Sequence, residues 1–222
     1  MSLIHYPSYL SKDYIEHEAI KILERMRTTP QYVPTFPLDP NRVAEFLGLD
    51  IVWDTLEADA QGQILARILP LRKLIEINDA IPELRENRGL ESSTIAHEIG
   101  HWVLHINHDE INGLSTQLTL DVQLEDSQPL LCRSMTRLEG IEWQAQYFAG
   151  CLLMPRSILE DILKDRKLTS WRHLYATAED LGVAISNLTG RLQNLGWINI
   201  SKVSKQIYLG KSSPTGQTNL LG

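Results

Sequence analysis

The chain has 222 residues, of which 43% are hydrophobic and 22% are charged, with two cysteines and a net charge of −7. These values are close to the averages for globular proteins and exclude a disordered chain, a collagen-like repeat and a coiled coil. Its apolar runs are too short for a membrane-spanning helix, and its first residues lack a secretory signal pattern. Two cysteines do not suggest a disulfide framework. We therefore expect a cytoplasmic protein without a membrane partner.

The charge is divided unevenly along the chain. Residues 1–163 carry 13 basic and 25 acidic side chains, for a net charge of −12, whereas residues 164–222 carry 8 and 3, for a net charge of +5. A change of sign between two parts of a chain suggests two modules with different partners. Chance clustering of solvated surface charge is the alternative interpretation.

The first part of the chain predicts two helices and three strands. Apolar residues at helical spacing indicate a helix over Ser11–Arg27, and a proline-rich connector follows it. Asp39-Pro40 is typical of a helix start, and that short helix should end at Gly48. Runs rich in isoleucine, valine and leucine then predict strands at Asp50–Trp53, Gln63–Leu69 and Lys73–Asn78.

The middle of the chain predicts two longer helices and one more strand. The helices cover Ser93–Asn107 and Leu138–Leu153, and Pro155 stops the second one. Between them, alternating apolar residues over 118–124 indicate a strand with a polar outer face. Together with the earlier strands, this pattern predicts a small antiparallel sheet among helices.

The last part of the chain predicts two short helices and a hairpin. The helices cover Ser170–Leu181 and Ala184–Leu195, with a turn at Gly182, and two apolar stretches follow at Trp197–Ile200 and Gln206–Leu209. Helix, tight turn, helix and hairpin form the outline of a winged helix-turn-helix. We therefore divide the chain into a first domain at 1–163, a winged helix-turn-helix-like domain at 164–211 and a flexible tail at 212–222.

The run His97-Glu98-Ile99-Gly100-His101 is a candidate metal-binding motif. His97 and His101 are four residues apart, which on a helix places them on one face, about 6 Å apart along the axis. Two imidazoles at that spacing can bind one tetrahedral ion, and Glu98 beside them could accept a proton from water that the ion activates. The alternative interpretation is that the two histidines lie on an ordinary helix, where they are exposed to solvent or hydrogen-bonded within the core.

A catalytic zinc site needs a third protein ligand, and Glu142 is the candidate. It lies on a predicted helix about forty residues downstream, where Ala145 and Ala149 share its face. Small side chains there, with Gly100 between the two histidines, would allow the two helices to approach closely. Surface charge for Glu142 and ordinary core packing for the alanines remain the simpler alternatives.

Two motifs resemble those of the ImmA/IrrE family of metallopeptidases. They are the run Ser93–His105, which contains His97-Glu98-Ile99-Gly100-His101, and the downstream pattern Glu142-x-x-Ala145-x-x-Phe148-Ala149-x-x-Leu152-Leu153-Met154-Pro155. The similarity covers about residues 11–200. Gln146 stands where the family usually has asparagine, and Ala184 where the second helix of the helix-turn-helix often begins with serine.

The resemblance implies that His97, His101 and Glu142 bind Zn2+ and that Glu98 is the catalytic glutamate. It also implies an intracellular endopeptidase whose substrate is a helix-turn-helix transcriptional repressor in a stress or mobile-element response. The fold we expect is α+β: a mainly helical, zincin-like metallopeptidase domain with a small antiparallel sheet, followed by the winged helix-turn-helix-like domain.

Two other kinds of protein remain as alternatives. A non-catalytic, zinc-stabilised regulator would bind DNA or a repressor through residues 164–211, and a purely structural zinc module is the third possibility. Structural sites usually have four cysteine or histidine ligands, which disfavours the last. Arg191 is the only basic residue on the predicted recognition helix, so we expect DNA binding to be weak or absent. Neither the substrate nor the oligomeric state follows from the sequence.

Three further side chains lie in or near the two motifs in the sequence. His105 lies two helical turns from His97, too far along an unbroken helix to bind the same ion. We expect it to be a simple helix-end histidine, with a contact to a metal ligand or to substrate as the alternative. Tyr147 and Arg137 are candidates for polarising a substrate carbonyl, and the sequence does not choose between them.

Overall fold

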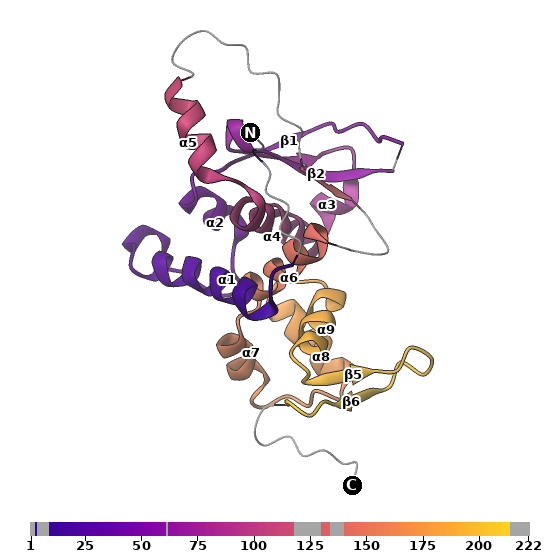
Figure 1. The fold of residues 1–222 in the computed structure, drawn as a ribbon. Coiled ribbons are helices and arrows are strands. Elements are labelled where there is room, and N and C mark those ends of the chain that lie inside the picture. Colours follow the sequence, from indigo (N-terminus) through magenta and orange to yellow (C-terminus); the bar gives the residue numbers. More distant parts are fainter. Residues whose placement is uncertain (1–2, 4–8, 61, 118–129, 134–139, 214–222) are drawn as a thin grey trace.

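A computed structural model of the protein describes residues 3, 9–60, 62–117, 130–133 and 140–213. Its fold is α+β (Figure 1). The helices are α1 (Lys12–Arg27), α2 (Pro40–Phe46), α3 (Pro82–Glu86), α4 (Arg88–His105), α5 (His108–Gln117), α6 (Ile141–Leu153), α7 (Arg156–Leu163), α8 (Trp171–Asp180) and α9 (Ile185–Asn194). The strands are β1 (Asp50–Asp54), β2 (Ile64–Leu69), β3 (Leu74–Asn78), β4 (Leu130–Arg133), β5 (Ile198–Ile200) and β6 (Ile207–Leu209).

The four-stranded sheet is mixed, so the prediction of an antiparallel sheet was wrong. Its strand order is β1-β3-β2-β4, and β1 pairs parallel with β3 while the other two pairings are antiparallel. The tight turn at Pro70–Arg72 returns the chain from β2 into β3, which enters between β1 and β2. All five residues of β3 are buried, as expected for a strand with neighbours on both sides. Periodicity alone does not reveal which strand becomes the neighbour of which.

Several predicted elements lie where expected, but the boundaries and some elements differ. Helix α4 begins at Arg88, five residues before the predicted start, because the Asn87 side chain accepts a hydrogen bond from the Leu90 main chain and caps it. Helices α5 and α7 were not predicted, nor was strand β4. The predicted strand at 118–124 lies outside the described residues, as do residues 214–222 of the predicted tail.

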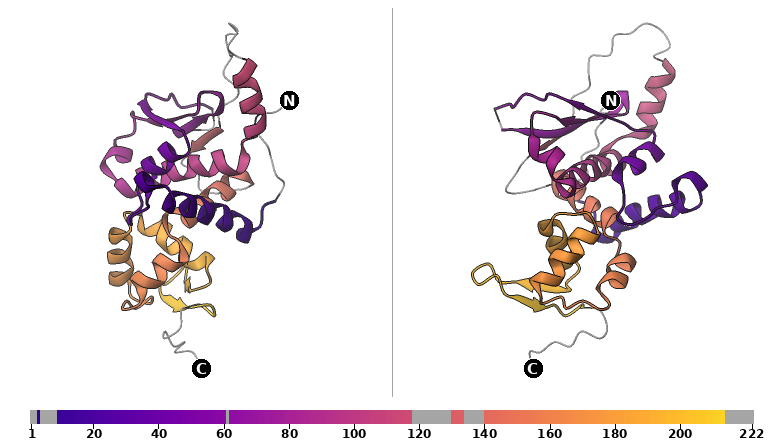
Figure 2. Two further views of the ribbon diagram at one scale, coloured as in Figure 1. Left: turned by 90° about the vertical axis from the view of Figure 1, so that its left-hand side faces the viewer. Right: turned by 180° about the vertical axis from the view of Figure 1, so that it is seen from behind.

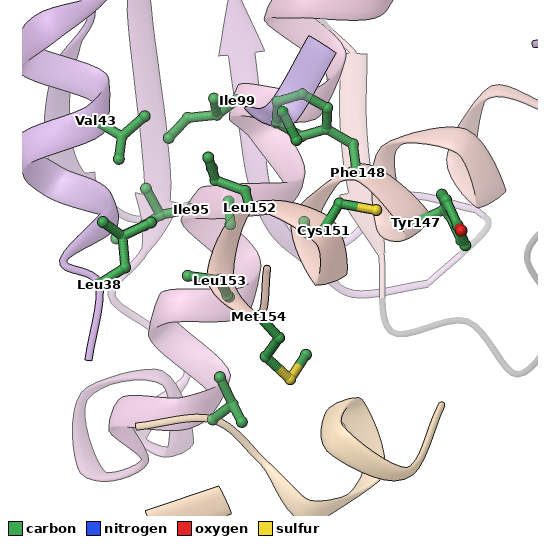
Figure 3. Close-up of a cluster of buried hydrophobic side chains, with 14 of the residues drawn as sticks. Leu38, Val43, Ile95, Ile99, Tyr147, Phe148, Cys151, Leu152, Leu153 and Met154 are labelled. Carbon is green, nitrogen blue, oxygen red and sulfur yellow. The ribbon is translucent and has the colours of Figure 1, made fainter. Parts of the chain in front are cut away.

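The core of the molecule lies where α4 packs along α6. Figure 3 shows Ile95 and Ile99 of α4 against Phe148 and Leu152 of α6, and all four are completely buried. Helix α1 lies against the other side of α6, and the sheet covers α4 (Figure 1). Helix α4 therefore runs through the interior, which explains why it is buried over most of its circumference.

The C-terminal helices and hairpin continue this core. Helices α8 and α9 are joined by a turn at Gly182, whose positive φ of 61° suits glycine, and β5 and β6 form an antiparallel hairpin. The hairpin lies at the end of the molecule opposite the four-stranded sheet (Figure 2). The turn before α9 lies directly against α4, since a Cβ on Gly89 would be 2.6 Å from the main-chain nitrogen of Ala184.

None of the described helices is long and apolar enough to cross a bilayer. The domain division at residues 163 and 164 stays a prediction.

Candidate metal centre

A close crossing of two helices brings the three predicted ligands together. His97 and His101 lie on successive turns of α4, and Glu142 lies in the first turn of α6. At the crossing, a Cβ on Gly100 would lie 2.9 Å from the main-chain oxygen of Ala145. No larger residue at position 100 fits this spacing without a shift of the backbone, so the glycine permits the approach.

The ligand atoms have the separations that a single metal ion requires. The Nε2 atoms of His97 and His101 are 3.0 Å apart. The Glu142 carboxylate oxygens lie 3.1 Å from His97 Nε2 and 3.3 Å from His101 Nε2. Two atoms bound tetrahedrally at about 2.0–2.1 Å would be about 3.3 Å apart. The three side chains therefore fit one ion, with the nitrogen and oxygen donors that a catalytic metal site uses.

The cluster is closed on the histidine side and open on the glutamate side. The side chains of His97 and His101 are 3% and 0% exposed, whereas that of Glu142 is 23% exposed. Burial lowers the pKa of His101, which favours the neutral imidazole that a metal ligand needs. Burial raises the pKa of Glu142, but its hydrogen bonds to His101 and His97 more than offset this, so its pKa lies well below the ordinary value. Glu142 is thus a carboxylate.

Glu98 differs from every other buried polar side chain of the described residues. It is completely buried, and neither carboxylate oxygen has a hydrogen-bond partner among the residues that the structure describes. Burial, with a smaller contribution from the Glu142 charge, raises the pKa of Glu98 to about 8. Buried polar groups in folded proteins are nearly always satisfied. A carboxyl group left without a partner beside a ligand cluster is therefore suited to interact with a group from outside the chain.

The sequence predicts that His105 is a simple helix-end histidine. It does end α4, but it also contacts a proposed metal ligand. It is completely buried, its Nδ1 lies 3.0 Å from Nδ1 of His101, and its Nε2 lies 3.1 Å from Oε1 of Gln144. Burial and the nearby His101 lower the pKa of His105 to about 4, so it is neutral. If Nε2 of His105 donates to Gln144, its Nδ1 accepts from His101 Nδ1, which leaves His101 Nε2 unprotonated for a metal.

His97 has a similar support, and this one was visible in the sequence. Its Nδ1 lies 3.4 Å from Oε1 of Gln146, which is one helical turn after Glu142 on α6. An amide at position 146 can therefore orient the first histidine. The Gln144–His105 pair was missed, because Gln144 is not part of the family pattern that drew attention to position 146 and its contact depends on how α4 and α6 cross.

The other candidates take different places. Tyr147 is buried, and its pKa is raised to about 12, mainly by burial and by the nearby Cys151. Its hydroxyl interacts with Arg191 and Cys151, so Tyr147 is not a candidate for the substrate carbonyl. Arg137 lies outside the described residues.

Arg191, the one basic residue of the predicted recognition helix, points into the protein rather than toward solvent. Its side chain is only 2% exposed, and its Nη2 donates a hydrogen bond of 2.6 Å to Glu16 of α1. This base is therefore unavailable to a DNA phosphate, and the face of α9 that carries it packs into the protein.

Comparisons with known proteins add little to this geometry. No protein-family model matches the sequence, and no curated protein matches it. Among solved structures, one described as a Mycobacterium tuberculosis transcriptional regulator has a TM-score of 0.49 and 19% sequence identity. The match covers 83% of this chain and 49% of that one, so this chain spans about half of that protein's length. Such a likeness carries no argument about function.

Proposed function

We propose that this chain is a zinc-dependent endopeptidase of the ImmA/IrrE type, with a zincin-like catalytic domain and a winged helix-turn-helix-like domain at 164–211. The observation that carries the proposal is Glu98, a buried carboxylate without a hydrogen-bond partner among the described residues, beside His97, His101 and Glu142. A regulator that only stored a metal would have no need of this unsatisfied group, whose burial is costly.

The proposed reaction is hydrolysis of a peptide bond. When bound, zinc supplies a Lewis acid that polarises a carbonyl and activates water near neutral pH. Glu98 accepts a proton from the attacking water and later donates it to the leaving amine nitrogen. The C–N bond breaks, the water oxygen remains on the acyl carbon, and the products are a carboxylate and an amine. Glu142, His97 and His101 hold the metal, and His105 and Gln146 fix the imidazole orientations.

The proposed substrate is a protein, namely a helix-turn-helix transcriptional repressor in a cytoplasmic response. Weak or absent DNA binding accords with the burial of Arg191 and with the contact between the start of α9 and α4. Incubating the zinc-loaded protein with the repressor-like protein encoded beside its gene should produce fragments that mass spectrometry identifies. An intact repressor after incubation with zinc-loaded protein would contradict this choice of substrate.

A second candidate function is a non-catalytic, zinc-stabilised regulator that binds DNA or a repressor. The observation that favours it is the group of exposed lysines at and beyond the hairpin, Lys202, Lys205 and Lys211. Gel-shift titration at physiological salt separates the two proposals. Nanomolar, sequence-selective binding would favour the regulator, whereas the peptidase proposal expects weak and non-specific binding at most.

Zinc content is the direct test of the site. Purified protein should hold about one zinc ion per chain, and His101→Ala should lose it, because two remaining ligands bind zinc weakly. His17→Ala is the matched control, since His17 is an exposed histidine on α1, and it should retain zinc. Elemental analysis after dialysis measures all three proteins. Equal zinc in the parent protein and in His101→Ala would remove this site.

A further inference from the structure

A pocket of about 390 Å³ lies between α6 and α9, next to the ligand cluster. This volume is within the roughly 300–1,000 Å³ of typical ligand sites. On both α4 and α6, a residue one helical turn from a proposed metal ligand lines the pocket. On α4, Ser93 lines it four residues before His97, and on α6, Gln146 lines it four residues after Glu142. A chain lying across the cluster could therefore continue directly into this pocket.

Two glycines leave this space between α6 and α9 unfilled by side chains. Gly150 of α6 and Gly190 of α9 both line the pocket. A Cβ on Gly190 would meet no atom within 4 Å, and one on Gly150 would meet only Arg191, at 3.8 Å. Gly190 lies inside a helix, where glycine costs stability and has no conformational need. Its place is better explained by the space that it leaves open.

The wall of the pocket that α6 forms is mainly apolar and aromatic, whereas most of the polar lining residues lie on α4 and α9. Trp143 and Tyr147 lie on successive turns of α6 with their rings stacked, 5.4 Å between centroids and 22° between planes. Leu153 extends the same wall. An apolar or aromatic side chain would find matching surface here.

Two of the amides that line the pocket offer unused hydrogen-bonding atoms. Asn187 donates through Nδ2 to Ser93, and Gln146 uses its Oε1 toward His97. Oδ1 of Asn187 and Nε2 of Gln146 have no partner among the described residues, so these two side chains present one acceptor and one donor. This pair matches the N–H and C=O groups of a peptide main chain.

The lining of the pocket has no uncompensated charge. Of the residues that line it, Arg191 alone is charged, and Glu16 compensates that charge at 2.6 Å. Lys12 of α1 lies outside the lining, where its Nζ donates to Oδ1 of Asn194 at 3.1 Å and is 5.5 Å from the centroid of the Tyr147 ring. A nucleic acid needs several cationic side chains for its phosphates, and this single lysine does not provide them. The lining itself offers no opposite charge to a charged peptide side chain.

We propose that this pocket is a specificity site for the protein substrate, which binds an uncharged peptide segment with an apolar or aromatic side chain between Trp143 and α9. The inference rests on the proposed peptidase function, since it takes the chain in the pocket to be the substrate. Helix α9 would then act as one wall of the substrate site rather than as a reader of DNA.

The test measures binding without turnover. Short capped peptides of glycine, alanine and serine, labelled with fluorescein and carrying one central phenylalanine, serine, aspartate or lysine, are titrated into zinc-loaded Glu98→Gln protein. Fluorescence anisotropy should show the tightest binding for the phenylalanine probe. Adding Gly190→Phe, which fills the pocket, should weaken that binding by at least about tenfold. Gly113→Phe, at an exposed glycine on α5, is the matched control and should not change it.

The outcomes separate this inference from the peptidase proposal. If Gly190→Phe does not fold by circular dichroism, Trp143→Ala replaces it, because it removes the opposite wall without adding volume. Unchanged binding in the pocket variant, equal binding of all four probes, or no binding would overturn the inference. Hydrolysis of the probes by protein with Glu98 intact is followed separately by mass spectrometry. If the probes bind in the expected order but are not hydrolysed, only the peptidase proposal is contradicted. If they are hydrolysed but Gly190→Phe does not weaken their binding, only the pocket proposal is contradicted.

Discussion

Two of the clusters of ionisable side chains within the described residues differ in how fully their hydrogen-bonding groups are satisfied. In the first, Glu16 of α1 accepts hydrogen bonds from Arg156 of α7, at 2.9 Å, and from Arg191 of α9, at 2.6 Å. Arg191 also donates to the main-chain oxygen of Met154, at 3.3 Å, and lies 3.2 Å from the sulfur of Cys151. This arginine cluster is complete within the chain, and it joins α1 to α6, α7 and α9.

The second cluster is the candidate metal centre, where one buried carboxyl group lacks the hydrogen-bond partners that the first cluster supplies. Glu142 contacts two imidazoles, and Glu98 contacts nothing that could hydrogen-bond to it among the described residues. Breaking a complete buried ion pair costs stability, whereas an incomplete buried group is tolerated where a ligand completes it. The comparison teaches that burial of charge alone does not mark a functional site; the missing partner does.

The largest expected effect is the loss of hydrolysis when Glu98, in the candidate metal centre, is replaced. Glu98→Gln should lower the rate of peptide hydrolysis by about 10²–10⁴-fold, because the amide cannot accept a proton from water. Zinc content and the unfolding transition should stay near those of the parent protein, since Glu98 is not a proposed ligand. Fragment formation from the repressor, followed over time, measures the rate. Hydrolysis at the parental rate would falsify the assigned role of Glu98.

The next largest expected effect is a loss of stability when the arginine cluster is disrupted. Arg191→Ala should lower the free energy of unfolding by about 3–5 kcal/mol, because it removes one partner of a buried pair and opens a cavity. Zinc content should not change. Urea unfolding followed by circular dichroism measures the loss. As a control, Lys21→Ala removes an exposed pair with Glu18 and should change stability by less than about 1 kcal/mol. Equal losses in the two variants would contradict the comparison.

A third variant acts on the ligand cluster through packing. Gly100→Ala should lower the free energy of unfolding by about 1–3 kcal/mol, because the added methyl group meets the Ala145 main chain. The two helices must then separate, so zinc affinity should also fall, as measured by competition with a chelator. Gly113→Ala, at an open position on α5, is the control and should raise stability by about 0.5–1 kcal/mol. Unchanged zinc affinity in Gly100→Ala would show that this contact does not set the site.

The smallest effect is a pH dependence of the arginine cluster. Burial raises the pKa of Glu16, but the hydrogen bonds and charges of Arg156 and Arg191 more than offset this, so its pKa lies below the ordinary 4.5. A lowered pKa means that Glu16 contributes stability above pH 4.5, and that this contribution is lost as the pH falls through the pKa of the folded state. The difference in unfolding free energy between the parent protein and Glu16→Gln should therefore shrink below about pH 4.5. A difference that stays constant down to pH 3 would contradict this linkage.

The features that the sequence predicted are those set within one or two helical turns. The spacing of His97 and His101 fixes them on one face of α4 wherever that helix packs, and Glu98 follows from the same motif. The small residues Gly100 and Ala145 indicated that α4 and α6 approach closely near Glu142, and the structure places Glu142 there. Helical and strand periodicity likewise located most of the elements.

What only the tertiary structure decided are the contacts between residues far apart in the chain. The pairing of β1 with β3, the His105–Gln144 contact, and the Arg191–Glu16 pair across 175 positions have no local pattern. The same is true of the pocket between α6 and α9, which exists because two helix faces with glycines meet. Periodicity says which face of an element is buried, but the partner of that face depends on how all the elements pack together.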